Sequence, residues 1–418
     1  MTKRLILAFV FLSWHLVACS NGDSGISSGL PDKPSAEEDS PGTETISEEM
    51  RVKITGEDLY ISAKLDAKTD ILYWFKKCMF NELFTFYRVG TIDNNMPAPA
   101  TLPDASPTSL LNLAYSDNIG PFNITGYGWC GGNHPYLDEV TQTARNIGYR
   151  IYIDGKEIKT DLSTLTKEIK IEVINEIMNP SKADTSSGKT LLNEILCIET
   201  VNYSIYRNNI QVLVTHEFQN ESPVTVQMYY GMQSMFDKET HTLTANGKYV
   251  DWTVQKDVST FTKKEYPSFR RFIEKSANAY QSSYLFADGL GNHEEISDDD
   301  IIFIGNSSNK TYHKIIADRE HKKGDIIHWS GVYTWFKSPV SDDDDLLCYE
   351  GVIDNKKVLF IDCKKSVDRT IQLPVNYTKK SFTIIEKSKS ITITGNKVTA
   401  KGLKIVSDGS GSCVITFD

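Results

Sequence analysis

Along most of the chain, apolar and polar residues alternate in short runs, and few segments repeat apolar residues at helical spacing. The runs are rich in Val, Ile, Thr, Tyr and Phe, which is typical of strands that bury one face. Pairs of turn-forming residues separate several of them, as in hairpins. We expect strands at 51–65, 149–153, 168–173, 201–205, 210–218, 224–230, 358–361, 391–394 and 413–417. The turn pairs are Asp154-Gly155, Asn208-Asn209, Asn246-Gly247 and Asp408-Gly409.

Helical patterns are scarce. Residues 266–279 and 110–115 are the best candidates, and both are short. Many strands with few helices favour stacked antiparallel sheets. The sequence therefore predicts an all-β protein, with a large antiparallel β-sandwich over 51–338 and a small C-terminal β module over 339–418. The boundary is placed near 339–345, after which the strands become shorter and richer in lysine.

The first residues have the layout of an export signal. Lys3 and Arg4 precede a largely apolar run, 5–17, which is too short for a permanent membrane helix. The run ends in Leu16-Val17-Ala18-Cys19, which resembles the lipobox of bacterial lipoproteins, where the cysteine receives a lipid. We therefore expect a signal peptide over 1–18, lipidation of Cys19 and a place on the outer membrane, at the cell surface or the periplasmic face. An ordinary cleaved signal that contains a cysteine is the alternative.

The segment 19–50 changes abruptly to Ser, Gly, Pro, Asp and Glu. Because it has almost no apolar residues to bury, ordering it would cost entropy without compensation, so we expect a disordered acidic tether. Its eight acids and one lysine supply about seven of the ten formal negative charges, and the body that follows is only mildly acidic. This mild charge leaves room for an anionic ligand at a locally basic patch.

The cysteines are scattered. Six follow Cys19 without CxxC or Cys/His spacing, so no zinc site of the finger type is expected. An exported location permits disulfides, and Cys348 and Cys363 are the closest pair in sequence. Separation in sequence alone does not show that their geometry suits a bridge.

The most unusual segment is 125–136, which combines four glycines with three aromatic residues, an asparagine and a histidine. Glycines let the backbone adopt conformations closed to other residues, and aromatic rings offer flat surfaces to a bulky ligand. Asn133 and His134 add an amide and a group that titrates near neutral pH, and Trp129 and Tyr136 flank them. The alternative is a tight structural loop whose polar groups satisfy the neighbouring backbone.

A second candidate is the segment 224–233, a strand that runs into Gly231 with Tyr230 and Gln233 on either side. His216 lies on the preceding strand. If the two strands form a hairpin, His216 and Tyr230 could share one face of the sheet. The alternative is that both are ordinary sheet residues.

Further candidates are basic or acidic. The segment 263–272 mixes cations with aromatics and includes Arg270, while Arg145 and Arg150 follow the glycine-rich segment. Guanidinium groups bind carboxylate or sulfate through two hydrogen bonds, although such a run is also typical of a solvated helix face. The acidic runs 298–300 and 342–345 could bind calcium or could be solvated loops. Motifs of serine hydrolases, P-loop enzymes, zinc proteases and dinucleotide-binding proteins are absent from the sequence, and no nucleic-acid partner is expected.

The lipobox, the acidic tether and the β-rich body together resemble surface lipoproteins with which gut Bacteroidetes capture and degrade polysaccharides. In addition, the stretches His216-Glu217-Phe218-Gln219-Asn220, Pro223-Val224 and Tyr229-Tyr230-Gly231 are similar to paired strands of galactose-mutarotase-like supersandwiches, a fold shared with several polysaccharide lyases. The resemblance implies a supersandwich and an anionic polysaccharide as partner. No lyase motif is matched residue by residue.

The first functional hypothesis is a lipid-anchored lyase of a uronate-containing polymer such as a glycosaminoglycan. β-Elimination needs a group that neutralises the uronate carboxylate, a base for the C5 proton and an acid for the leaving oxygen. The candidates are, in that order, Asn133, Gln233 or Arg145; His134 or His216; and Tyr230 or Tyr136. Trp129 and Arg270 are expected to bind the polymer. No cofactor is required, although a divalent cation such as calcium could neutralise the carboxylate.

Two other functions remain open. A non-catalytic glycan-binding lipoprotein needs the same aromatic residues but no proton-transfer pair, and a structural or adhesion subunit comes third. A glycoside hydrolase would call for two placed carboxylates, and no such acidic pair stands out in a motif.

Overall fold

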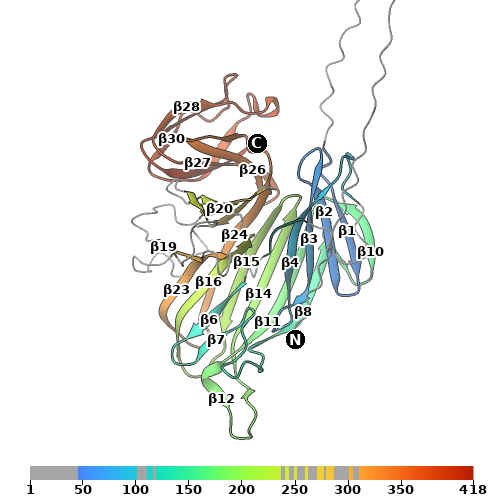
Figure 1. The fold of residues 1–418 in the computed structure, drawn as a ribbon, viewed down its shortest axis with the longest axis vertical. Helices are drawn as coiled ribbons and strands as arrows, with labels where there is room; N and C mark the ends of the chain where they lie inside the picture. The colour runs from blue at the N-terminus through green and yellow to red at the C-terminus, as the bar shows by residue number, and fades with distance from the viewer. Residues whose placement is uncertain are drawn as a thin grey trace, which may run out of the picture. The chain divides into compact units, whose positions relative to one another are not determined.

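The computed structural model of the chain describes residues 46–100, 111–115, 119–236, 241–243, 249–251, 259–261, 271–276, 279–286, 301–304 and 310–417 (Figure 1). The signal peptide, Cys19, the tether up to residue 45 and Arg270 lie outside these residues. The described residues form strands and short 3-10 helices without an α-helix, so the expected all-β class is confirmed. None of the helices in the described ranges is long and apolar enough to cross a bilayer.

The larger sheet has twelve strands within the described residues. They are β1 (Met50–Thr55), β2 (Asp58–Lys64), β3 (Thr69–Cys78), β4 (Leu83–Asp93), β5 (Leu111–Tyr115), β6 (Ile119–Ile124), β7 (Gly128–Cys130), β10 (Leu162–Thr166), β16 (Val224–Phe236), β19 (Ser259–Phe261), β22 (Ile301–Ile304) and β23 (Lys310–His321). Their order is β10-β1-β2-β3-β4-β5-β16-β23-β22-β19, and β6 pairs with both β16 and β7.

The second sheet has ten strands in the same described part of the chain. They are β8 (Ala144–Ile153), β9 (Lys156–Ile158), β11 (Ile169–Met178), β14 (Ile195–Tyr206), β15 (Asn209–Phe218), β17 (His241–Leu243), β18 (Tyr249–Asp251), β20 (Arg271–Lys275), β21 (Tyr280–Leu285) and β24 (Ile326–Phe336). Their order is β18-β17-β20-β21-β24-β15-β14-β11-β8-β9. A short hairpin of β12 (Ala183–Asp184) and β13 (Leu191–Leu192) follows the 3-10 helix η2 (Pro180–Lys182).

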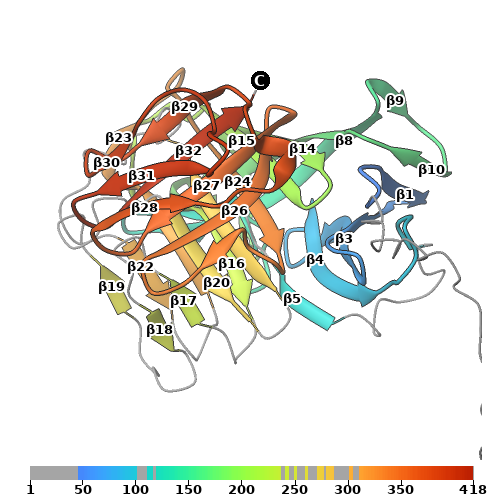
Figure 2. The same cartoon turned by 90° about the horizontal axis from the view of Figure 1, so that it is seen from above.

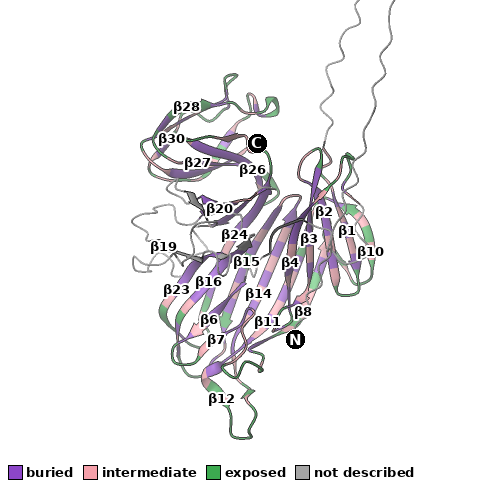
Figure 3. Ribbon diagram, viewed as in Figure 1, coloured by how far each residue is buried: buried purple, intermediate pink, exposed green. Residues whose placement is uncertain are grey.

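Alternation along the strands decides which face is buried. In β14, Val201, Tyr203 and Ile205 are buried, whereas Asn202 and Ser204 between them are partly exposed. The buried faces of both sheets belong to one hydrophobic core, so the sheets form the two layers of an antiparallel sandwich. Figure 3 shows this burial as purple segments that alternate with other colours along the strands.

The C-terminal strands gather into a group of their own (Figures 1 and 2). One sheet contains β25 (Ser341–Asp342), β26 (Leu346–Ile353), β27 (Lys356–Cys363), β29 (Phe382–Lys387) and β32 (Gly411–Phe417). The other contains β28 (Val367–Ile371), β30 (Ile391–Ile393) and β31 (Leu403–Ser407), and the 3-10 helix η5 (Val375–Tyr377) precedes β29. This group has one hydrophobic cluster of its own and shares another with β20, β21 and β24. The limits 51–338 and 339–418 stay predictions.

Two local expectations are wrong, and the cysteine pair left open above is not bridged. Residues 271–275 and 111–115, expected as helices, are strands β20 and β5. Each has strand partners on both sides, and this long-range pairing outweighs the local helical pattern. Cys348 and Cys363 are free thiols, because the register places Ile361 opposite Cys348 and Leu346 opposite Cys363.

Candidate functional site

The glycine-rich segment is held against β16 by strand pairing. β6 pairs with β16 on one side and with β7 on the other, so the residues that follow β7 return to this part of the larger sheet. Gly131 and Gly132 have φ angles of 77° and 49°, in the left-handed region that glycine adopts without a steric penalty. A Cβ on Gly132 would lie 3.2 Å from the carbonyl oxygen of Ile119. Glycine therefore lets the segment close tightly over β6.

Three expected site residues meet here. The ring of Trp129 stacks with His134, with centroids 5.3 Å apart, and with Tyr230, with centroids 5.8 Å apart. Tyr230 in turn contacts Tyr312 of β23, with ring centroids 4.1 Å apart. We call Trp129, His134, Tyr230 and Tyr312 the ring cluster. The strand pairing thus brings together two segments that are about a hundred residues apart in sequence.

The ring cluster lies on the face of β16 that points away from the core. On the core side, Tyr229 is buried and accepts a hydrogen bond of 2.8 Å from the indole of Trp329. A Cβ on Gly231 would also meet the side chains of Ile315 and Trp329. Since successive strand residues point to opposite faces, Tyr230 points to the outer face.

The chemistry of this outer face combines rings, a phenol and a cation. Lys314 is the register partner of Tyr230 and follows Tyr312 by two residues, so it shares their face. Burial raises the pKa of Tyr312 to about 12, and its hydrogen bond with Tyr230 acts in the opposite direction. The hydroxyl of Tyr312 is therefore protonated at neutral pH and can donate a hydrogen bond.

His216 lies inside the sandwich. It is fully buried, and its Nε2 is 2.9 Å from Oε2 of Glu199. The expected hairpin of 210–218 with 224–230 is wrong, because β15 pairs with β14 and β24 in one sheet while β16 pairs with β23 in the other. The ring of His216 contacts Tyr229 on the core side, with centroids 5.0 Å apart, so β16 separates it from Tyr230. The proposed catalytic role of His216 stays a prediction, and this placement gives it no access to the ring cluster.

The remaining expected ligands serve the local structure. Oδ1 of Asn133 accepts a 2.6 Å hydrogen bond from the backbone N–H of Phe80, and Tyr136 lies half-buried in the turn that closes on Thr141. Arg145 pairs with Glu176, and Arg150 lies 2.6 Å from Glu172. Gln233 is 4% exposed, and its backbone carbonyl oxygen accepts a 2.7 Å hydrogen bond from the hydroxyl of Tyr333. None of these five side chains belongs to the ring cluster, and Arg270 lies outside the described residues.

Three of the four aspartates in the acidic run 342–345 are paired with basic side chains. Lys364 lies 3.0 Å from Asp342, Lys365 lies 2.8 Å from Asp345, and Arg369 lies 2.7 Å from Asp343. Across the described ranges, no group of three or more His, Cys, Asp or Glu residues is arranged to hold a metal ion. The other acidic run, 298–300, lies outside those ranges.

Two kinds of site residue were missed from the sequence. Tyr312 and Lys314 alternate along β23 as strand residues do, but only the pairing with β16 shows that they belong beside Tyr230. Asn81 was missed as well. Its amide donates to the carbonyl oxygens of Gly132 and His134 at 2.8 and 3.1 Å, and so holds the glycine-rich segment.

No protein-family model and no curated protein matches the chain. Among solved structures, the GH36 α-galactosidase AgaB from Geobacillus stearothermophilus is 9% identical over 69% of this chain and 41% of its own, with a TM-score of 0.39. The galactosidase domain of the α-galactosidase–sucrose kinase AgaSK is 9% identical over 66% of this chain and 40% of its own, with a TM-score of 0.36. A Streptomyces coelicolor chondroitin AC lyase variant is 8% identical over 86% of this chain and 48% of its own, with a TM-score of 0.17.

The chain spans about two fifths of the length of the two galactosidase structures. Likeness at these TM-scores bears on neither activity nor substrate. Function is therefore inferred from the ring cluster and its surroundings.

Proposed function

We propose that the protein is a lyase of a uronate-containing polysaccharide and that the ring cluster is its active site. The observation that carries this proposal is that His134 and Tyr230 both stack on the indole ring of Trp129. A titratable imidazole, a phenol and a flat ring are the groups that glycan binding and proton transfer need. Lys314 adds a cation on the same face.

In this proposal each step of β-elimination has a candidate group. Lys314 faces the uronate carboxylate, which makes the C5 proton more acidic. His134 takes that proton, the electron pair forms the C4–C5 double bond, and the bond from C4 to the glycosidic oxygen breaks. Tyr230 gives its proton to the leaving oxygen and is hydrogen-bonded to Tyr312, which stays protonated at neutral pH. Trp129 stacks on a neighbouring sugar ring.

A non-catalytic glycan-binding role is the second candidate. Tyr230 and Tyr312 are 6% and 7% exposed and pack against each other, so their hydroxyls have little contact with solvent. A site that only binds a polysaccharide would need the ring surfaces and Lys314 but no proton transfer.

An absorbance assay separates the two functions. Chondroitin, hyaluronan, heparin and alginate are incubated in turn with the protein, and the absorbance of a new unsaturated uronate is followed. We expect an increase with one polymer, loss of more than about 99% of the rate in His134→Ala and Tyr230→Phe, and little change in Tyr127→Phe. Tyr127 is an exposed tyrosine of the same segment, so its variant is a matched control. No increase with any polymer, together with retention on a polymer column, would favour the binding role.

The location is a separate part of the proposal. Cys19 would carry a lipid after removal of residues 1–18, and the acidic tether would then hold the body at the outer membrane, as in the surface lipoproteins that the sequence resembles. Labelled palmitate should enter the wild-type protein but not Cys19→Ser when both are produced in a bacterial host. Equal labelling of both proteins would contradict lipidation of Cys19.

A further inference from the structure

A pocket that shares no residue with the ring cluster is lined by residues between Glu48 and Tyr377 of the chain. A cavity of about 430 Å³ lies where the β14–β15 turn meets the end of β24, residues 337–340 and the C-terminal strands. Sites for small molecules commonly have volumes of roughly 300 to 1,000 Å³. Its lining includes Glu48, Tyr206, Arg207, Phe336, Glu350 and Tyr377.

The lining of this cavity is basic. Among the lining residues there are four cations and two carboxylates, and all the others are neutral. One carboxylate, that of Glu48, pairs with Lys357 at 2.5 Å and is also attracted by Arg207 and Lys167, which together lower its pKa. The cavity rim therefore already holds one carboxylate of the chain itself. After this pairing, three cations, among them Arg207, and one carboxylate remain in the lining, so the cavity keeps a net positive charge.

Arg207 is held in a conformation that costs energy. The turn expected at Asn208-Asn209 is shifted by one residue and is formed by Arg207 and Asn208. The backbone of Arg207 has a φ of 48°, a value that residues other than glycine and asparagine rarely adopt. Its Nη2 donates to the carbonyl oxygen of Lys64 at 3.3 Å, whereas its buried Nε has no hydrogen-bond partner among the described residues. A strained backbone and an unsatisfied buried donor both disfavour an arginine here unless a ligand uses it.

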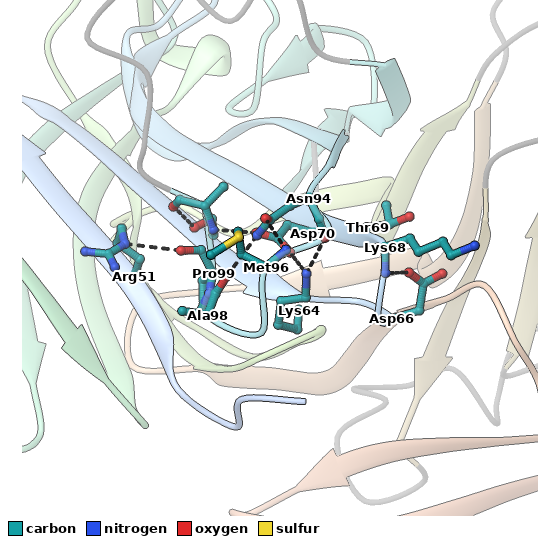
Figure 4. A network of polar contacts seen from close by, with 12 residues as sticks. Arg51, Lys64, Asp66, Lys68, Thr69, Asp70, Asn94, Met96, Ala98 and Pro99 are labelled. Carbon is teal, nitrogen blue, oxygen red and sulfur yellow. Dashed lines mark hydrogen bonds and ion pairs between the residues drawn. The ribbon is translucent and has the colours of Figure 1, made fainter. Parts of the chain in front are cut away.

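The group that orients Arg207 is itself fixed. The ammonium of Lys64 lies 2.8 Å from the buried carboxylate of Asp70 and donates to the carbonyl oxygen of Asn94 at 2.6 Å (Figure 4). This network holds the carbonyl that Arg207 binds. The guanidinium is therefore positioned in advance, which lowers the entropy that binding an anion would cost.

Tyr377 supplies a second donor. Its side chain is 1% exposed and lines the cavity, and its hydroxyl makes no hydrogen bond of ordinary geometry to any residue that the structure describes. Burial, and then the neighbouring carboxylate of Glu350, raise its pKa, so the hydroxyl keeps its proton. Tyr206 and Phe336 add aromatic surface to the same lining.

We infer that this cavity is a binding site for an acidic sugar of one or two rings, with the carboxylate on Arg207 and a ring hydroxyl on Tyr377. The aromatic side chains would contact the C–H face of the ring. The choice of a sugar rests on the proposed function, whereas the choice of an anion rests on the cavity alone. The site would bind the ends of chains or released products, separately from the ring cluster.

Calorimetric titration of the full chain with glucuronate tests this inference. Glucose serves as the neutral sugar and sodium sulfate as the anion without a sugar. We expect saturable binding of glucuronate, no detectable binding of glucose, and weaker binding of sulfate. Arg207→Gly and Tyr377→Phe should each weaken glucuronate binding roughly tenfold or more. Lys189→Gln, which removes an exposed cation between β12 and β13, should leave it unchanged.

Arg207→Gly also separates a ligand-binding role from a structural one. Glycine suits the left-handed turn, so the unfolding midpoint should stay the same or rise while binding is lost. A lower midpoint with unchanged glucuronate binding would overturn the inference, as would equal affinity for glucose or for sulfate. A chain inactive on every polymer that still binds glucuronate through Arg207 would remove the proposed function and keep this site.

Discussion

Glu274 is the clearest case in which burial changes the behaviour of a single residue. It is 3% exposed, its Oε1 accepts a hydrogen bond from Thr311 of the opposite sheet, and Oε2 has no partner among the described residues. Burial raises the pKa of Glu274 to about 7, although the bond from Thr311 lowers it. The folded chain therefore holds this proton up to a higher pH than the unfolded chain does.

The pH dependence of stability follows from this shift. Between about pH 4.5 and pH 7 the unfolded state releases the proton first, so the free energy of unfolding falls as the pH rises, by up to about 3 kcal/mol. Glu274→Gln removes this titration. Urea unfolding at pH 5 and pH 8 should show a gain for the variant at pH 8 that largely disappears at pH 5. An equal effect at both pH values would mean that Glu274 is ionised throughout.

The contribution of His321 to stability depends on pH in the opposite direction. Burial lowers its pKa to about 4, so its contribution to stability is present above about pH 6.5 and is lost as the pH falls towards 4. The difference between wild type and Glu274→Gln cancels this contribution, because His321 is the same in both chains. The effect of Glu274 is therefore measured from the difference between the two chains at each pH, and not from the wild-type profile alone.

At the scale of elements, Asn81 joins the end of β3 to the glycine-rich segment. Beyond its two bonds to that segment, its Oδ1 accepts hydrogen bonds from the backbone of Thr143 and Ala144 at 3.0 and 3.3 Å. Asn81→Ala would leave buried donors and acceptors unsatisfied, so we expect a loss of about 2 to 3 kcal/mol in the free energy of unfolding and misplacement of His134.

Gln142→Ala is the matched control for Asn81→Ala. Its amide donates to the carbonyl of Phe80 at 2.9 Å, but at an exposed position, so its loss should cost less than about 1 kcal/mol. Urea unfolding gives the two stabilities, and polymer cleavage or binding reports on the site. If both variants lose the same small amount, the segment does not depend on Asn81.

The elements also show what a sequence can predict. Alternation identified β14, β15, β16 and β32 because a half-buried strand imposes period two on its own residues. It did not identify partners, because pairing depends on residues far along the chain. The helix expected over 266–279, of which residues 271–275 form β20, and the hairpin of β15 with β16 were wrong for this reason.

The residues of the candidate site also fall into those that the local sequence identified and those that only strand pairing identifies. Trp129 and His134 could be found because glycines and aromatic residues concentrate in one segment, and Tyr230 because a strand meets a glycine. Tyr312 and Lys314 could not, since their relation to Tyr230 exists only in the register of β16 and β23. The shift of the turn to Arg207 could not be foreseen either, because an arginine is an unusual choice for a left-handed position.

At the scale of the whole molecule, the C-terminal strands are joined to the sandwich by aromatic packing around one buried ion pair. Phe336 of β24 stacks on Tyr349 of β26, which stacks on Phe360 of β27, with centroids 4.3 and 5.0 Å apart. Beside this stack, Arg271 of β20 lies 2.6 Å from Asp362 of β27, and both side chains are 2% exposed. The aromatic packing favours association of the C-terminal strands with the sandwich. The ion pair favours the one arrangement of the two in which both buried charges have a partner.

Removing one partner of the Arg271–Asp362 pair should therefore lower the free energy of unfolding more than replacing both partners by apolar residues. Burial raises the pKa of Asp362 to about 6 despite the opposing effect of Arg271. In Arg271→Met the carboxylate is left buried without its cation, and we expect a loss of about 3 to 5 kcal/mol at pH 8. At pH 5 the loss should be smaller, because Asp362 takes up a proton and becomes neutral.

The double variant Arg271→Met/Asp362→Leu should recover most of the stability at pH 8. Urea unfolding of both variants at the two pH values measures this, and a double variant as unstable as Arg271→Met would show that Arg271 acts through its packing and not its charge.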